Sequence, residues 1–225
     1  MKLIKIALLL AISCMGTALA QDPPDISERY ADLEEDKSGF RETWVVPGAD
    51  FTKYNKLFIW NAEFQFRDVG PARRTRSTFM SSRKTEFGIS DKDREEFQRI
   101  VSDAFLEEIQ QARNFELVEV DGVDQDTLIM RGAVLDIISR VPPETIGRSE
   151  IYLSSIGEAT LVMELLDAGT GDVVALVAER RHLQRSGGIG MIPTSIPTII
   201  ADLRGWARRA AKTLRTELDN AIAGL

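Results

Sequence analysis

The chain has 225 residues and a formal net charge of −7, from 28 lysines and arginines and 35 aspartates and glutamates. This acidic balance makes nucleic acid and anionic membrane poor partners for the surface as a whole, although a local patch can behave otherwise. The length is ample for one domain with its own hydrophobic core.

The first 20 residues have the pattern of a secretory signal peptide. Lys2 and Lys5 form a positively charged start, residues 6–12 are an unbroken apolar run, and small residues follow at 17–20. The apolar run is well short of the roughly 20 residues that span a bilayer, and polar sequence follows it. We therefore expect export to the periplasm of a Gram-negative bacterium, without a transmembrane span.

Two cleavage positions are compatible with this pattern. Cleavage after Ala20 follows the small residues of Ala18-Leu19-Ala20 and would release a soluble protein with no cysteine, and so with no disulfide. The alternative treats Ala11-Ile12-Ser13-Cys14 as an imperfect lipobox, in which case Cys14 would carry lipid and anchor the protein at the outer membrane. The small-residue rule favours cleavage after Ala20.

The segment after the signal predicts an acidic lead-in and two strands. Residues 21–42 are polar and acidic without a sustained period, so we expect them to be exposed. A short strand at 43–46 ends at Pro47-Gly48. Apolar residues then alternate with polar ones over residues 58–66, which predicts a strand with one buried face. The apolar set is Phe58, Trp60, Ala62, Phe64 and Phe66.

Residues 67–89 lose this period and predict a long basic loop. Arg67 opens it, and its other basic residues are Arg73, Arg74, Arg76, Arg83 and Lys84. A helix follows from about 91 to 112, because Ser90 and Asp93 have capping spacing and apolar residues recur at helical intervals.

The second half predicts four more extended segments and a long helix. Residues 115–120 and 127–138 are extended, and 157–167 and 173–183 form a hairpin across a turn that contains Gly169 and Gly171. From Pro197 an amphipathic helix runs to the C-terminus, with Trp206 on its apolar stripe. Its basic stripe is Arg204, Arg208, Lys212 and Arg215, which we interpret as a solvated face, with docking of an acidic partner as the alternative.

These elements predict a single α+β domain over residues 43–225. Two amphipathic helices need one apolar sheet face to cover, so we expect a two-layer sandwich with a mixed, largely antiparallel sheet.

No motif predicts a catalytic, cofactor or metal site. His182, the single histidine, lies on a predicted strand, where a packing or surface role is the common one. Asp121, Asp124 and Asp126 lack the glycine and the downstream glutamate of a calcium loop, so we interpret them as a solvated turn.

Several short motifs resemble the bacterial domain-of-unknown-function 3313 family over roughly residues 43–222. They are Gly48-Ala49-Asp50-Phe51 with Tyr54 and Leu57, Gly157-Glu158-Ala159, Leu165-Leu166-Asp167, Thr170-Gly171-Asp172, Trp206, Leu214-Arg215 and Leu218-Asp219. The resemblance implies an envelope protein, often a lipoprotein, with a mixed α/β fold. It carries over no activity or catalytic residue.

The leading hypothesis is a non-enzymatic binding or accessory module of the cell envelope. The alternatives are a hydrolase whose carboxylates converge in the fold, and a small-ligand carrier with an apolar cavity. The candidate partner surface is the basic loop with Arg73, Arg74, Arg76, Arg83 and Lys84, which would bind an acidic protein face or an anionic envelope component such as lipopolysaccharide phosphates. The alternative, which is the commoner case for such a segment, is a solvated loop without a partner.

Overall fold

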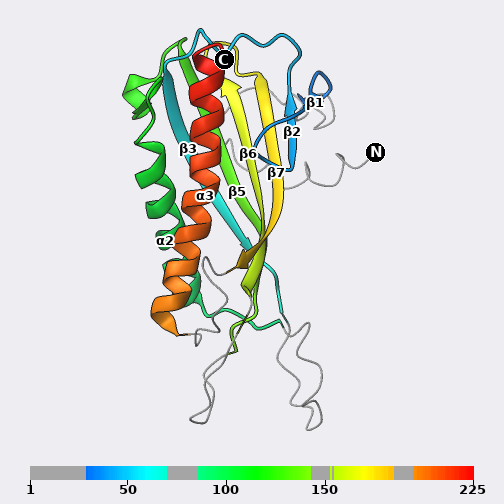
Figure 1. Ribbon diagram of the computed structural model, residues 1–225, viewed down its shortest axis with the longest axis vertical. Coiled ribbons are helices and arrows are strands. Elements are labelled where there is room, and N and C mark those ends of the chain that lie inside the picture. Colours follow the sequence, from blue (N-terminus) through cyan, green and yellow to red (C-terminus); the bar gives the residue numbers. More distant parts are fainter. Residues whose placement is uncertain (1–28, 70–85, 143–152, 154, 185–194) are drawn as a thin grey trace, which may run out of the picture.

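Two helices cover one face of a seven-stranded sheet in the computed structural model (Figure 1), which describes residues 29–69, 86–142, 153, 155–184 and 195–225. The helices are α2 (Asp91–Ile109) and α3 (Ile196–Ile222). The predicted two-layer α+β sandwich is therefore confirmed.

The sheet has the strand order β1-β2-β7-β6-β5-β3-β4. The strands are β1 (Glu34–Asp36), β2 (Glu42–Val45), β3 (Lys56–Phe66), β4 (Glu116–Val118), β5 (Thr127–Ser139), β6 (Ser155–Asp167) and β7 (Val173–Gln184). β3 pairs in parallel with both β4 and β5, and the other neighbouring pairs are antiparallel. The predicted hairpin is the β6–β7 pair.

The main hydrophobic core fills the space between the sheet and the two helices. Trp206 of α3, Leu57 of β3 and Ile100 of α2 are among its largest fully buried side chains. The opposite sheet face, here called the open face, carries a smaller apolar cluster. Tyr30, Leu33 and Trp44 pack against it.

Both helices begin at capping residues that the sequence provides. The Ser90 hydroxyl accepts a hydrogen bond from the Asp93 amide at 3.2 Å, as its spacing predicted. The Thr198 hydroxyl accepts one from the Ser195 amide at 2.8 Å at the start of α3. α2 ends at Ile109, earlier than expected, because the chain turns there and docks on α3. The Asp219 carboxylate accepts hydrogen bonds from the amides of Arg113 and Asn114 at 3.0 and 2.9 Å.

The burial predicted for alternate residues of β3 is wrong at Trp60 and Ala62, which are both exposed. The pairing register with β5 shifts between Ile59 and Asn61, and such a bulge moves the following side chains to the other face. Leu57 and Ile59 therefore face the helices before the shift, and Phe64 and Phe66 do so after it. Trp60 is 54% exposed, not buried as predicted.

Part of the predicted acidic lead-in belongs to the sheet. Glu34–Asp36 form the edge strand β1, whose side chains are exposed, and Phe40 is buried in the main core. A domain start at residue 43 is therefore too late. None of the helices among the described residues has the length and apolar character needed to cross a membrane.

Candidate functional site

A cleft of about 460 Å³ lies between α3 and the β1–β2 hairpin. Its floor is apolar, because it includes Val45 of β2 and Ala175 and Val177 of β7. Leu218 and Ala221 of α3 lie along one wall. A volume of this size is in the range of small-ligand sites, which are commonly apolar with a few polar groups.

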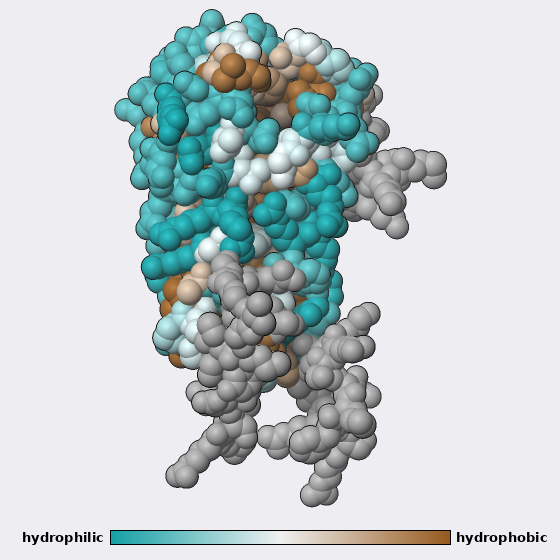
Figure 2. Space-filling view, in the orientation of Figure 1, coloured by the Kyte–Doolittle hydropathy of each residue, from teal (hydrophilic) through white to brown (hydrophobic). Residues whose placement is uncertain are grey.

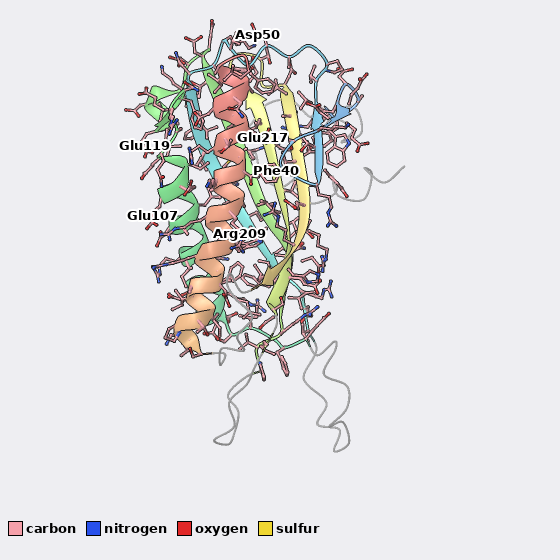
Figure 3. The ribbon with its side chains drawn as sticks, in the orientation of Figure 1. Phe40, Asp50, Glu107, Glu119, Arg209 and Glu217 are labelled. Carbon is pink, nitrogen blue, oxygen red and sulfur yellow. The ribbon has the colours of Figure 1, made fainter. Side chains whose placement is uncertain are left out.

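The cleft exists because the sheet is wider than its helical cover. α2 and α3 pack against each other, and β1 and β2 extend the sheet beyond α3 (Figure 1). The loop that joins these strands returns towards α3, where the Gly39 amide donates a hydrogen bond to the Glu217 carboxylate at 2.9 Å. Phe40 and Glu217 lie beside each other on this side of α3 (Figure 3). The loop therefore closes one part of the cleft.

A tight turn borders another part of the cleft. The Ala49 amide donates a hydrogen bond to the Val46 carbonyl at 3.0 Å, and Gly48 has a φ of 74°. Pro47 followed by a glycine of positive φ is typical of a type II turn. The turn predicted from Pro47-Gly48 is therefore present, and it leads the chain to Phe51, which also lines the cleft.

The rim of the cleft is acidic. Glu34, Glu35, Asp36 and Glu217 line it with Lys37 as the one basic lining residue among those described. On the face of the molecule shown in Figure 2, hydrophilic residues dominate, and hydrophobic atoms gather at the end where α3 finishes. The cleft thus combines an apolar floor with a net negative border.

A second, more polar pocket of about 430 Å³ lies by the β6–β7 turn. The Asp167 carboxylate accepts hydrogen bonds there from Lys53 Nζ at 2.6 Å and the Tyr54 hydroxyl at 2.8 Å. It also accepts bonds from the amides of Gly169 and Thr170 at 2.7 and 3.1 Å. Burial opposes ionisation of Asp167, but these donors outweigh it and lower its pKa to about 2.

This second pocket does not support the hydrolase alternative. Such enzymes need one carboxyl that is kept protonated beside one that is ionised. Hydrogen bonds from Thr52 lower the pKa of Asp50, so Asp50 and Asp167 are both shifted downward. Burial together with the bond to Asp167 raises the pKa of the Tyr54 hydroxyl to about 12, so this group is a donor and not a base. The hydrogen bonds of Asp167 therefore hold the β6–β7 turn in its conformation.

Two charged networks lie on the open face. Burial raises the pKa of Glu164, against the charge of Arg29, and its carboxylate is ion-paired with Arg131 and hydrogen-bonded to the Tyr30 hydroxyl. In the other network Asp136, which has a φ of 52° at a bulge in β5, accepts bonds from Arg67 and Arg180. Each carboxylate is satisfied by arginine, which indicates a structural role for both networks.

The structure does not test the residues proposed from the sequence for partner binding. Arg73, Arg74, Arg76, Arg83 and Lys84, and the candidate lipidation residue Cys14, lie outside the described residues. Arg67, which opens the basic loop, is ion-paired with Asp136 and with Glu86, the latter at 3.0 Å. This one residue is therefore occupied within the fold.

Other sequence-derived residues have structural partners. Asp124 accepts hydrogen bonds from the Asp126 amide at 3.1 Å and the Thr127 hydroxyl at 3.0 Å, so it organises a turn. Within the described residues no group of three His, Cys, Asp or Glu side chains is arranged to hold a metal ion. His182 is exposed, and its Nδ1 lies 3.3 Å from the Glu158 carboxylate.

The basic stripe of α3 partly contacts α2. Arg208 lies 2.8 Å from Glu107, and Arg215 lies 2.9 Å from Glu108. For Arg208 and Arg215, therefore, the acidic partner is α2 of the same chain.

The cleft itself was not predicted. Its rim residues Glu34 and Asp36 belong to the segment interpreted as a lead-in, and three consecutive acids do not resemble a strand. Phe40 was the usable signal, because it is a large apolar side chain close to the acidic run in a largely polar stretch.

The fold and the cleft define a two-layer α+β protein with an open, apolar-floored cleft. No protein-family model matches the chain, and no curated protein matches it. The resemblance to the domain-of-unknown-function 3313 family therefore stays a prediction.

Several solved structures share similarity with most of the chain. The PelC dodecamer from Paraburkholderia phytofirmans is 10% identical over 80% of this chain and 96% of that one, with a TM-score of 0.32. A Xanthomonas campestris protein of the domain-of-unknown-function 330 family is 11% identical over 79% and 90%, with a TM-score of 0.45. A neuraminyllactose-binding hemagglutinin homolog from Helicobacter pylori is 12% identical over 76% and 89%, with a TM-score of 0.36. Similarity at this level assigns the chain to none of these families.

Proposed function

We propose that this protein is a non-enzymatic binding module of the Gram-negative cell envelope, and that it holds an apolar group of its ligand in the cleft between α3 and the β1–β2 hairpin. The observation that carries the proposal is the apolar floor of this cleft, which includes Val45, Ala175 and Val177. Burial of apolar ligand surface on such a floor contributes roughly 25 cal/mol per Å² before the costs of association.

The envelope location rests on the N-terminal sequence pattern. We propose cleavage after Ala20, which gives a mature protein that starts at Gln21, and the motif resemblance to the domain-of-unknown-function 3313 family agrees with an envelope protein. Intact-mass measurement of the protein released by osmotic shock tests this. A diacyl or triacyl addition on Cys14 would instead establish the lipoprotein alternative.

The binding function is tested by an uncharged apolar dye, Nile red. Ala221 of α3 lines the cleft and is only partly buried, so a larger side chain there fills the cleft without entering the core. We expect Nile red fluorescence to rise with the wild-type protein and to stay low with Ala221→Phe. Ala201→Phe is the matched control, because Ala201 is exposed elsewhere on the same helix.

The two variants separate cleft binding from adsorption. If both give the wild-type fluorescence, the dye binds elsewhere and the proposed function is wrong. Circular dichroism of the variants checks that α3 is intact in each.

A further inference from the structure

Glu34 and Asp36 of β1 lie on the sheet face that forms the cleft, and Glu35 borders the cleft from the strand's other side. Glu34 pairs with Val45 and Asp36 pairs with Thr43, and directly opposed residues of an antiparallel pair share a sheet face. Val45 and Thr43 both line the cleft. Glu35 pairs instead with Trp44, which packs on the open face.

The negative charge of the cleft rim is not balanced within the described part of the chain. Glu34 and Asp36 are exposed and form no ion pair there with lysine or arginine. Glu217 is engaged by the Gly39 amide, which is a neutral donor. Elsewhere in the fold acidic residues such as Glu108 and Asp136 are paired with arginine. The rim therefore offers carboxylates for which a ligand can supply the cations.

The cleft also opens beside an available strand edge. β1 is the last strand in the sheet order, so its outer backbone edge has no strand partner among the described residues. An extended peptide can add to such an edge by main-chain hydrogen bonds while its alternate side chains enter neighbouring pockets. This favours a peptide segment over a compact small molecule.

We infer that the cleft binds a short extended segment of a partner protein that combines apolar side chains with lysine or arginine. This inference rests on the proposed function, since it names the ligand class of the same cleft. The apolar side chains occupy the floor, and the basic side chains lie against Glu34 and Asp36. Charge complementarity across the rim selects basic segments over acidic ones of equal hydrophobicity.

The charge contribution is expected to be modest per residue. One exposed ion pair is worth about 0.2–1 kcal/mol, which corresponds to a factor of about 1.5–5 in affinity. Most of the affinity comes from the apolar floor, whereas the choice between basic and acidic segments comes from the rim. This choice should weaken as salt rises through about 0.1 M, where the screening length is about 10 Å.

The test uses fluorescein-labelled peptides that alternate leucine with lysine, leucine with glutamate, or serine with lysine, with binding followed by fluorescence anisotropy. We expect the leucine–lysine peptide to bind most tightly, and Ala221→Phe to abolish its binding. Glu34→Gln should weaken it by a factor of about 1.5–5 at low salt. Glu42→Gln, the same change at an exposed position of β2 that pairs with Ala178 of the open face, should leave it unchanged.

The outcomes separate the inference from the proposed function. Equal binding of the leucine–lysine and leucine–glutamate peptides, or equal effects of Glu34→Gln and Glu42→Gln, overturns the inference while Nile red binding still supports the apolar cleft. Equal binding of the serine–lysine and leucine–lysine peptides also overturns it, because attraction would then come from charge alone. Failure of Nile red to bind overturns both proposals.

Discussion

The Tyr54 hydroxyl donates a hydrogen bond to the Asp167 carboxylate at 2.8 Å, although 113 residues separate them in the sequence. Lys53 Nζ donates to the same carboxylate at 2.6 Å. The two bonds tie the loop before β3 to the turn between β6 and β7. They link segments that are far apart in the sequence, and they make the stability of the turn depend on the charge of Asp167.

This arrangement predicts a loss of stability in acid. The pKa of Asp167 is lowered from 3.8 to about 2 in the fold, so its ionised form contributes stability that is complete above the unfolded pKa. That contribution, about 2 kcal/mol, is lost as the pH falls from about 4 towards 2. Urea unfolding of wild type and Asp167→Asn measures it. We expect the difference in unfolding free energy to shrink through this window, and a constant difference would contradict the role of the charge.

Trp206→Ala is expected to lower the free energy of unfolding by about 3–5 kcal/mol, the usual loss for a buried aromatic side chain. Trp206 is 2% exposed in the main core. The matched control is Trp60→Ala, because Trp60 is 54% exposed at the β3 bulge. We expect that change to cost less than about 1 kcal/mol. Equal losses in urea unfolding would mean that the bulge is misplaced.

The difference between these tryptophans shows what periodicity can and cannot predict. Trp206 lies in a helix whose apolar stripe continues over many turns, so its face is specified by its neighbours. Trp60 lies in a strand, where a single extra residue moves every following side chain to the other face. Neither Ile59 nor Asn61 carries a sequence signal for such a shift.

The cleft could not be predicted from the sequence for a related reason. Strand β1 is only three acidic residues long, and its place in the sheet depends on pairing with β2, which in turn pairs with the distant β7. Local propensity for Glu34 or Asp36 opposes a strand, so tertiary pairing overrides it. The long strands and both helices, in contrast, bury enough apolar surface to be recognised from their period alone.

Gly171→Val is expected to lower stability by about 1–2 kcal/mol, because left-handed backbone is costly for a residue with a Cβ. Gly171, in the predicted hairpin turn, has a φ of 78°. A Cβ would meet no atom within 4 Å there, so any cost is conformational and not steric. Gly171→Asn is the control, since asparagine tolerates this region better. Thermal denaturation should rank wild type, then asparagine, then valine, while leucine–lysine peptide binding per folded molecule stays constant.

The contact between α2 and α3 offers a comparison of two ion pairs that differ in burial. Arg215 and Glu108 have side chains 15% and 14% exposed, whereas Arg208 and Glu107 are 52% and 58% exposed. Water and salt screen an exposed pair more than a buried one, and ordering two long side chains offsets part of any gain. The buried pair should therefore couple the helices more strongly.

Double-mutant cycles measure this coupling. We expect Arg215→Met with Glu108→Gln to show a coupling energy on the order of 1 kcal/mol that changes little with added salt. The cycle of Arg208→Met with Glu107→Gln should give a smaller value that vanishes in high salt. Arg215 also lies 3.7 Å from Asp219, so the first cycle is repeated with Asp219→Asn in the background to separate that contribution. If the exposed pair couples as strongly as the buried one, burial does not determine the strength of these ion pairs. The arginines of α3 would then act through long-range electrostatic attraction to α2 and not through individual contacts.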